Sequence, residues 1–584
     1  MLSQHIPSRL GAATVARAAA LVVLAGAGLV AGAGATAYAV TEVSSSVRGT
    51  DGRTYTATNH LTQAALKGGP REWLLAWAGA ANGNDPAAQD FIAVIDATKG
   101  SRTYGQVVNT VTVSPQEHNE PHHLQYIWHK GQHIFAAGMF SDSSFVFDSR
   151  ALPALRITGI NLAADTPCGS APDAFWSLRD GTAYATYLGG PDVAGPCTYT
   201  NGEVRVGNGA NGSPGEVVRV GADGRTLAEI PMALPAGEDP AICHNTPSIT
   251  PASCANPHGL QVREDLNLMV VSDFAEIKNF LDASTVQTDP FLLRNTVRIM
   301  DITDRNNPRI RSVSYLDAGP RVDQLPAFDE NRMVMENAVT NQHRHKGAFA
   351  STMAGGAVYY TPDITSPAPV WREVFDDTAA YRKFDPSGVL TGSNDGGSWL
   401  QVTPDDRFLI HGVMGSDPRV PRTSNSGMVF VLDIQKLIAA GDDPKCHIDT
   451  VEEVAAGGGE PDCPALTGVV PIADSVSPGV GVGPHWGSED LFQRDHRGFY
   501  TEAQHISRIA TSDYFVAQTG IDGDHRVCML DLSPAGALSL DQSFRDEQTH
   551  QPCVSFNRQT WPHGSVGGAR PHGVLFVVSD AVLH

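Results

Sequence analysis

Basic side chains are scarce in this sequence, and two common catalytic signatures are missing. The 584 residues include 41 Lys and Arg against 63 Asp and Glu, a formal net charge of −22, without any run of five basic residues. Because binding to a phosphate backbone needs clustered Lys and Arg, we expect no nucleic-acid partner. The sequence has no G-x-S-x-G elbow, and its glycine-rich stretches lack the lysine of a phosphate-binding loop.

Long hydrophobic runs are equally scarce, and the one that occurs lies near the N-terminus. Arg9 and Arg17 precede an apolar stretch of 17 residues, Ala18 to Gly34, and small residues follow as far as Ala39. This order is typical of an export signal, whereas an uncleaved membrane anchor, the alternative, is usually longer. We predict a signal peptide at 1–39, cleaved near Ala39. The protein would then be exported, secreted or held in the cell envelope, with no stable membrane span after cleavage.

None of the eight cysteines forms a C-x-x-C pair, which argues against a cysteine metal site. An even number of cysteines in turn-rich segments is typical of disulfides in an oxidising compartment. Since short loops close most easily, we predict four pairs of sequence neighbours, which are Cys168–Cys197, Cys243–Cys254, Cys446–Cys463 and Cys528–Cys553.

A strand-and-turn pattern dominates the rest of the chain. Gly (58) and Pro (38) are frequent, and a short β-branched or aromatic strand that ends in Asp or a turn recurs seven times, first as "FIAVID" and last as "RVCMLD". Such units at roughly blade length predict an all-β protein, a seven-bladed β-propeller with long loop insertions over residues 69–584. Two β-sandwiches are the alternative. Residues 40–68 are expected to form a polar lead-in, and 195–215 and 453–484 long loops.

Several of the 21 histidines stand where the first strand of a blade is expected to begin. First strands line the central channel of a propeller, so residues far apart in sequence converge there. Neutral imidazoles that converge are good ligands for copper, zinc or iron. Glu336 could orient such a ligand through its second ring nitrogen. His485 and His563, in Gly-rich loops, are weaker candidates. The predicted metal ligands are His122, His123, His258, His343, His505 and His572.

The same segments resemble the selenium-binding protein family, whose bacterial members include periplasmic methanethiol oxidases. The similarity runs in order from about residue 115 to the C-terminus. It is carried by "PHHLQYIW", "NLMVVSDFAE…NTVRIMDITD", "ENAVTNQHRHKGAFASTMAGGAVYY", "LQVTPDDRFLIHG" and "ARPHGVLFVVSD".

The resemblance implies a seven-bladed propeller with copper near its axis, and oxidation of a small thiol by O₂. In the family, methanethiol, O₂ and water give formaldehyde, hydrogen sulfide and hydrogen peroxide. It implies site roles for His122, His123, His343 and His572, with Glu336 behind them, and we take His122, His123 and Glu336 as catalytic candidates. His258 and His505 rest on blade position alone.

Two departures from the family pattern bear on this expectation. No cysteine follows the His-His pair, so selenium attachment is not expected, and the histidine-containing block of the second blade reads "APDAFWSLRD" here. Because one expected ligand is thus missing, a non-catalytic propeller that binds a ligand or partner stays open as an alternative. A four-histidine iron oxygenase of the carotenoid-cleavage kind is a further one.

Overall fold

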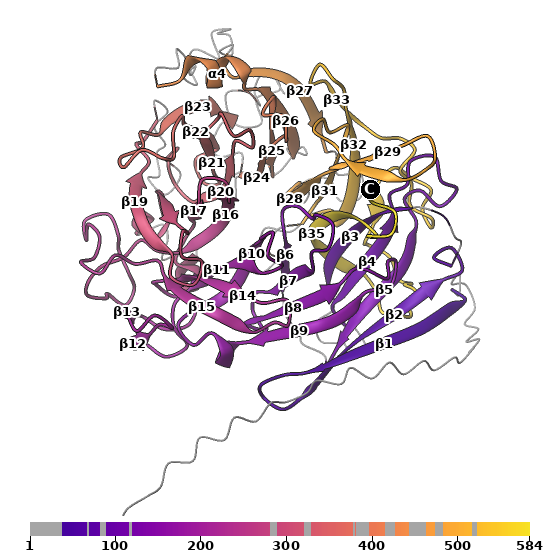
Figure 1. Ribbon diagram of the computed structural model, residues 1–584, viewed down its shortest axis with the longest axis horizontal. Helices are drawn as coiled ribbons and strands as arrows, with labels where there is room; N and C mark the ends of the chain where they lie inside the picture. The colour runs from indigo at the N-terminus through magenta and orange to yellow at the C-terminus, as the bar shows by residue number, and fades with distance from the viewer. Residues whose placement is uncertain are drawn as a thin grey trace, which may run out of the picture.

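The computed structural model shows seven sheets set around a central axis (Figure 1). It describes residues 38–584 except 67–68, 70, 82–88, 116–119, 281–288, 320–328, 378–379, 381–395, 415–426, 443–462, 473–482, 515 and 517–522. The chain forms a seven-bladed β-propeller, which confirms the predicted fold and excludes the paired sandwiches.

Each blade is an antiparallel sheet that runs outward from the axis. The innermost strands, in chain order of the blades, are β35 (Ala569–Val578), β6 (Pro121–Leu124), β10 (Ser170–Ser177), β16 (Pro257–Arg263), β20 (Val334–Val339), β24 (Gly397–Val402) and β28 (Trp486–Glu489). The second strands are β3 (Glu72–Ala80), β7 (Ile134–Gly138), β11 (Ala183–Gly189), β17 (Leu268–Asp273), β21 (Ala348–Thr352), β25 (Phe408–Val413) and β31 (Arg508–Ser512).

The third strand of each blade is the repeated segment that the sequence predicts. These strands are almost entirely buried because blades pack against both faces, so they read as continuous apolar runs. They are β4 (Phe91–Asp96), β8 (Ser143–Asp148), β14 (Glu216–Val220), β18 (Thr296–Asp301), β22 (Ala357–Thr361), β26 (Met428–Asp433) and β32 (Arg526–Leu532). Outside them lie β5 (Val107–Ser114), β9 (Arg156–Leu162), β15 (Thr226–Pro231), β19 (Arg309–Tyr315), β23 (Arg372–Asp376), β27 (Ala465–Pro471) and β33 (Leu538–Leu540).

The two ends of the chain meet in the first blade. The C-terminal β35 pairs antiparallel with β3 and thereby closes the ring. The segment 40–68, expected as a polar lead-in, contains β1 (Val40–Arg48) and β2 (Thr54–Thr62), which extend the same sheet at its outer edge through β5. The first blade therefore combines residues from both termini.

Two short hairpins, one additional strand and a few short helices lie outside the four main strands of the blades. Within 195–215, expected as a loop, β12 (Gly195–Thr198) pairs with β13 (Val204–Gly207). A second hairpin joins β29 (Phe492–Arg494) to β30 (Tyr500–Glu502), and β34 (Val554–Ser555) pairs with β32. The described helices are short: α1 (Ile277–Phe280), α4 (Gln435–Ala440) and the 3₁₀ turns Ala163–Asp165 and Pro290–Leu292.

Three predicted disulfides are present, Cys168–Cys197, Cys243–Cys254 and Cys528–Cys553. Cys463 is buried, and its predicted partner Cys446 lies outside the described residues, so that pair stays a prediction. Such bonds are consistent with an extracellular or periplasmic protein.

Within the ranges that the structure describes, no helix is long and apolar enough to cross a membrane. The predicted signal peptide lies outside them, apart from its last two residues. Of the other long loop expected from the sequence, 453–484, most residues are likewise not described.

Candidate metal centre

A β-bulge interrupts six of the seven innermost strands at the same level along the axis. The pairing register shifts between Pro121 and Leu124, and at equivalent positions of β10, β16, β20, β24 and β35. A bulge leaves residues unpaired and re-aims their side chains. The residues released in this way include His122 and His123, Asp173, His258, Glu336, Trp399 and His572.

Close approach of neighbouring inner strands needs small residues beside the bulges. Gly573 follows His572, and a Cβ at Gly573 would lie 2.6 Å from the backbone nitrogen of Leu124 in the next blade. A side chain there would push β35 away from β6 and carry His572 out of the channel.

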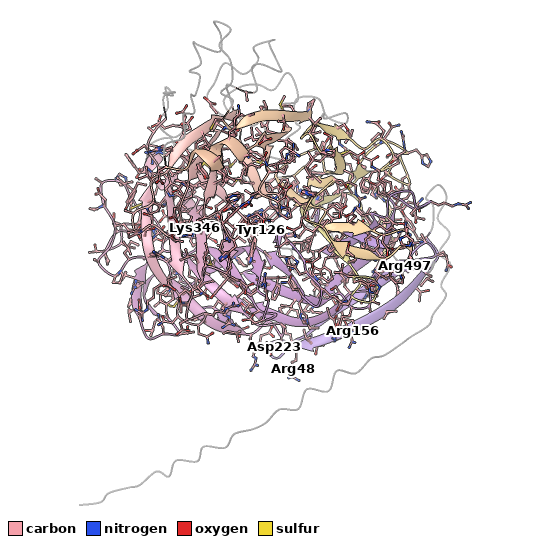
Figure 2. The ribbon with its side chains drawn as sticks, turned by 45° about the horizontal axis from the view of Figure 1, so that its top comes forward. Arg48, Tyr126, Arg156, Asp223, Lys346 and Arg497 are labelled. Carbon is pink, nitrogen blue, oxygen red and sulfur yellow. A yellow bond between two sulfur atoms is a disulfide. The ribbon has the colours of Figure 1, made fainter. Side chains whose placement is uncertain are left out.

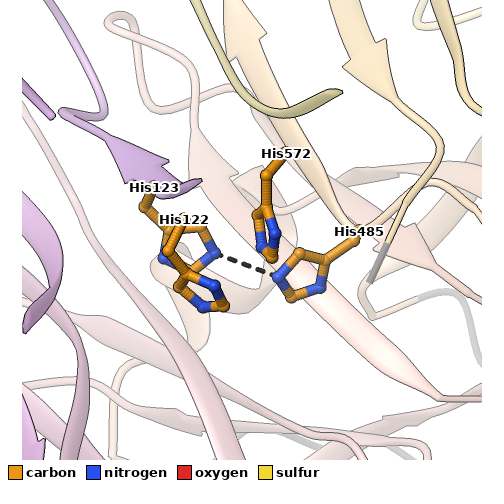
Figure 3. Close-up of side chains that lie close together, drawn as sticks. All are labelled: His122, His123, His485 and His572. Atoms are coloured by element: carbon orange, nitrogen blue, oxygen red, sulfur yellow. Dashed lines mark hydrogen bonds between the residues drawn. The ribbon is translucent and has the colours of Figure 1, made fainter. Parts of the chain in front are cut away.

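Four buried imidazoles converge at this level (Figure 3). His122, His123, His485 and His572 each offer one ring nitrogen, and these atoms all lie within 4.8 Å of one another. The Nε2 atoms of His123 and His485 are 3.0 Å apart. Two nitrogens bound to one metal ion at about 2.0–2.1 Å in tetrahedral geometry are separated by about 3.3 Å, so this spacing suits a shared ion.

Asp173 lies directly behind two of these histidines. Its Oδ1 is 2.9 Å from Nδ1 of His123 and 3.0 Å from Nε2 of His122. The carboxylate thus faces one nitrogen of each ring and leaves the other nitrogen for the shared centre. Metal-binding histidines commonly have such a partner, which fixes the tautomer and the ring orientation.

His258 and Glu336 extend this polar group across the channel. Nδ1 of His258 lies 3.4 Å from Oδ2 of Asp173 and 3.2 Å from Oε1 of Glu336. The other carboxylate oxygen of Glu336 accepts a hydrogen bond from the hydroxyl of Tyr126. His122, His123, Asp173 and His258 also form a second group of donor atoms within 4.8 Å.

Burial sets the protonation of these groups. It lowers the pKa of His123 to about 3 and holds the pKa of His122, His485 and His572 below the usual value, the last two far below it. These rings are therefore neutral near pH 7, which is the form that binds metals.

The ionisable groups next to the four neutral rings have pKa shifts that favour charge on two of them, Asp173 and His258. Burial alone would raise the pKa of Asp173, but His258, His123 and His122 hold it well below the ordinary value. Burial lowers the pKa of His258, yet Asp173 and Glu336 outweigh this, so the net shift is upward. Burial raises the pKa of Glu336 despite His258. Asp173 and His258 thus form a buried ion pair beside the neutral histidines.

The donor atoms fit a bound metal ion. Both ring nitrogens of His572 are buried and make no hydrogen bond, although buried polar atoms are normally paired. An ion held by the four imidazoles would satisfy one of these two nitrogens. The residues present, nitrogen donors with a carboxylate behind them, are of the kind that binds copper, zinc or iron.

Two predicted ligands lie elsewhere. The side chain of His343 is 85% exposed in the turn after β20, where it contacts Asp265, and that of His505 is 82% exposed before β31, where it contacts Asp405. The expectation that these histidines begin first strands is wrong, because both belong to solvated turns. His122, His123, His258, His572 and Glu336 do lie on innermost strands, at the channel.

Sequence reasoning gave too little weight to His485 and missed Asp173. The signal that could have found them is a proline just before the residue. Pro precedes His122, Asp173, His258, His485 and His572, at five of the seven innermost strands. The block "APDAFWSLRD", where the sequence predicts a missing ligand, thus places Asp173 within 3.0 Å of His122 and His123.

Comparison with known proteins supports the fold. No family model matches the sequence, and no curated protein matches it. The fold is similar to that of a hypothetical selenium-binding protein from Sulfolobus tokodaii, with a TM-score of 0.54 and 14% identity over 88% of this chain and 95% of that chain. The periplasmic gluconolactonase of Pseudomonas aeruginosa gives a TM-score of 0.43 and 13% identity, over 87% of this chain and 99% of that chain. At 14% identity the similarity to the Sulfolobus protein shows a shared propeller fold alone.

Proposed function

We propose that this protein is an exported, copper-dependent oxidoreductase that uses O₂ to oxidise small thiols. The observation that carries the proposal is the set of four neutral, buried imidazoles, His122, His123, His485 and His572. For a methanethiol-like substrate the reaction would be methanethiol, O₂ and water giving formaldehyde, hydrogen sulfide and hydrogen peroxide.

Copper is favoured by the donor set. Imidazole suits copper in both oxidation states, and the affinity of nitrogen sites for divalent metals peaks at copper. Copper held there would exchange electrons with a thiol and with O₂. Among the described residues, the two groups of donor atoms at the channel contain no cysteine.

The protein's own groups would have distinct tasks. The four histidines would hold the ion, and Asp173 would fix the orientation of His122 and His123. His258 and Glu336 lie next to this set and can hold or pass a proton when a thiol is deprotonated. The buried position excludes bulk water from the reacting atoms.

An apolar, methionine-rich cluster borders the end of the channel where the innermost strands begin. It includes Phe274, whose ring centroid is 4.9 Å from that of His258. Apolar groups on this side of the histidine set would favour a small neutral substrate over a charged one. Five of the 11 methionines of the chain belong to it, Met139, Met333, Met335, Met353 and Met414.

Elemental analysis of the purified protein tests the metal. We expect near-stoichiometric copper in the wild type and loss of copper from His485→Ala and His572→Ala. The matched controls are His343→Ala and His505→Ala, whose exposed rings lie away from the set, and both should retain copper. Iron in place of copper would overturn the metal assignment and favour an iron oxygenase.

Turnover is tested separately on the loaded protein. Addition of methanethiol should cause O₂ consumption together with release of peroxide and sulfide, and His485→Ala should abolish all of these. A protein that stays metal-free after copper loading would contradict the proposal, and a ligand-binding propeller would then be the better description.

A further inference from the structure

A chain of three aromatic rings leads away from the histidine set. The indole of Trp486 stacks on the imidazole of His123, with ring centroids 3.9 Å apart and planes at 22°. Tyr126 follows at 4.8 Å from Trp486, and Trp176 at 5.8 Å from Tyr126. Each step is within the range of direct ring contact. Figure 2 shows Tyr126 near the middle of the ring of blades.

This chain of aromatic rings ends at a cavity near the opposite end of the central channel. Trp176 lines this cavity of about 340 Å³, together with residues that follow or end β6, β10, β16 and β20, among them Ile127 and Val262. The histidine set lies where the innermost strands begin, and the cavity lies where they end. The three rings therefore connect a buried site to a region open to small molecules.

The environment of the rings suits reversible one-electron oxidation. Trp486 and Tyr126 are fully buried and Trp176 is 8% exposed, so radicals on them would be shielded from solvent. The Tyr126 hydroxyl donates to Glu336. A phenol becomes very acidic when it loses an electron, and a carboxylate already in hydrogen-bond contact can take its proton without any rearrangement.

We propose that Trp486, Tyr126 and Trp176 carry single oxidising equivalents from the histidine set to the cavity. In the central step Tyr126 gives one electron through Trp486 to the oxidised centre, and its phenolic proton passes to the Glu336 carboxylate. The products are a neutral tyrosyl radical and a protonated Glu336.

The reverse step returns the tyrosyl radical to the reduced Tyr126. A soluble thiol in the cavity loses one electron to the radical through Trp176 and releases its own proton to solvent, while the proton on Glu336 returns to Tyr126. The thiol is left as a thiyl radical, and two such radicals couple to a disulfide in solution. The direction of flow rests on the proposed function, because a redox-active ion in the histidine set is the other terminus. The ability of Tyr126 to form the radical depends only on the rings and Glu336.

The test begins with metal-free protein and a one-electron oxidant in solution, photogenerated tris(bipyridyl)ruthenium(III). After illumination and freezing, electron paramagnetic resonance should detect a neutral tyrosyl radical in the wild type. Tyr126→Phe should lose most of the signal. The matched control is Tyr187→Phe, because Tyr187 is equally buried but does not belong to the chain of aromatic rings. Its hydroxyl donates to Asn161. This variant should keep the wild-type signal.

Two further variants separate an electron path from simple core packing. Glu336→Gln keeps Tyr126 but removes the proton acceptor, and should lower the radical yield. Trp176→Phe, at the cavity, should slow radical formation even if Tyr126→Phe does not fold. Equal signals in the wild type, Tyr126→Phe and Trp176→Phe would overturn the proposal.

A second arm uses copper(I)-loaded protein and the same oxidant. Oxidation of the copper should be slower in Trp486→Phe than in the wild type, as followed by the copper(II) signal. Unchanged oxidation in Trp486→Phe would contradict the path. Failure of the protein to bind copper would count against the proposed function alone, because the metal-free arm does not depend on it.

Discussion

Asp173 controls the orientation of two histidines of the candidate centre, His122 and His123. One of its two carboxylate oxygens, Oδ1, faces both His122 and His123, so the carboxylate leaves the other nitrogen of each ring for the candidate centre. Asp173→Asn keeps the size but removes the charge and one acceptor. We expect copper affinity to fall by about 10–100-fold, measured by competition with a chelator of known affinity.

Asp265→Asn is the matched control for this change. Asp265 also faces a histidine nitrogen, that of His343 at 3.0 Å, but on the surface. Copper affinity in this variant should equal that of the wild type. Wild-type affinity in Asp173→Asn as well would show that the histidines hold their orientation without the carboxylate.

His563 offers a pH-dependent contribution to stability away from the histidine set. It packs beside Phe91, and burial lowers its pKa to about 3 from an unfolded value of 6.5. The unfolded chain therefore binds more protons between these values, so stability falls as the pH drops from 7 to 5. The expected loss from this residue is at most about 2 kcal/mol.

Urea unfolding of His563→Gln at the two pH values measures this loss. The variant should lose about 2 kcal/mol less than the wild type between pH 7 and 5. His343→Gln, with its exposed ring, should behave as the wild type does. An identical pH dependence in all three proteins would refute the assignment to His563.

Residue identity alone allowed only part of the candidate centre to be predicted. His122, His123, His258, His572 and Glu336 lie at the channel as expected, since a proline or an apolar strand marks their position. His343 and His505 do not, because a histidine in a polar turn has the same local sequence features whether or not the fold turns it inward. The local sequence therefore does not show whether such a histidine points into the channel or into solvent.

At the scale of single elements, third strands were far easier to predict than first strands. The third strand is buried on both faces and reads as an apolar run, as in Met428–Asp433. The first strand is short, carries a bulge and directs polar side chains into the channel, as in Pro121–Leu124. Neither alternation nor an apolar run therefore marks it, and its place had to be inferred from the repeat.

Strand β35 is the element whose loss should have the largest effect. It is the innermost strand of the first blade, and its pairing with β3 is the contact that closes the ring. A chain that ends at Gly568 leaves β3 with an open edge and the ring incomplete. We expect it to show no cooperative unfolding transition in scanning calorimetry.

Removal of β1 and β2 is the matched control, because these strands extend the outer edge of the same sheet. A chain that begins after Thr62 should keep a cooperative transition at a lower temperature, since the four inner strands of the blade remain. A cooperative transition in the chain without β35 would show that ring closure is not required for folding.

At the scale of the whole molecule, the described disulfides leave ring closure non-covalent. Cys243–Cys254 closes a loop within the connection between β15 and β16, and the other two also lie within one blade or its insertion. The double variant Cys243→Ser/Cys254→Ser should lower the free energy of unfolding by about 3 kcal/mol, as measured by urea denaturation. A stability equal to that of the wild type under oxidising conditions would contradict this expectation.

The predicted cleavage of the signal peptide has two candidate positions, and the contacts of Tyr38 distinguish them. Two small-x-small triplets end at Ala37 and Ala39, so either could precede the cut. The Tyr38 hydroxyl donates to Glu547 and accepts from Gln548, contacts that a cut after Ala39 would remove. We expect the exported chain to begin at Tyr38, which its intact mass would show. A mass that begins at Val40 would mean that these contacts are dispensable.

The position of His572 on β35 bears on when the candidate centre can form relative to folding. The four imidazoles of the candidate centre come from the second blade, from the seventh, and from β35 in the first blade, so they cannot meet on a chain that lacks β35. The proposed metal would then be bound with full affinity only after β35 has been made and has closed the ring. For a chain that folds after export, the compartment in which folding occurs, rather than the cytoplasm, would then decide which metal it acquires.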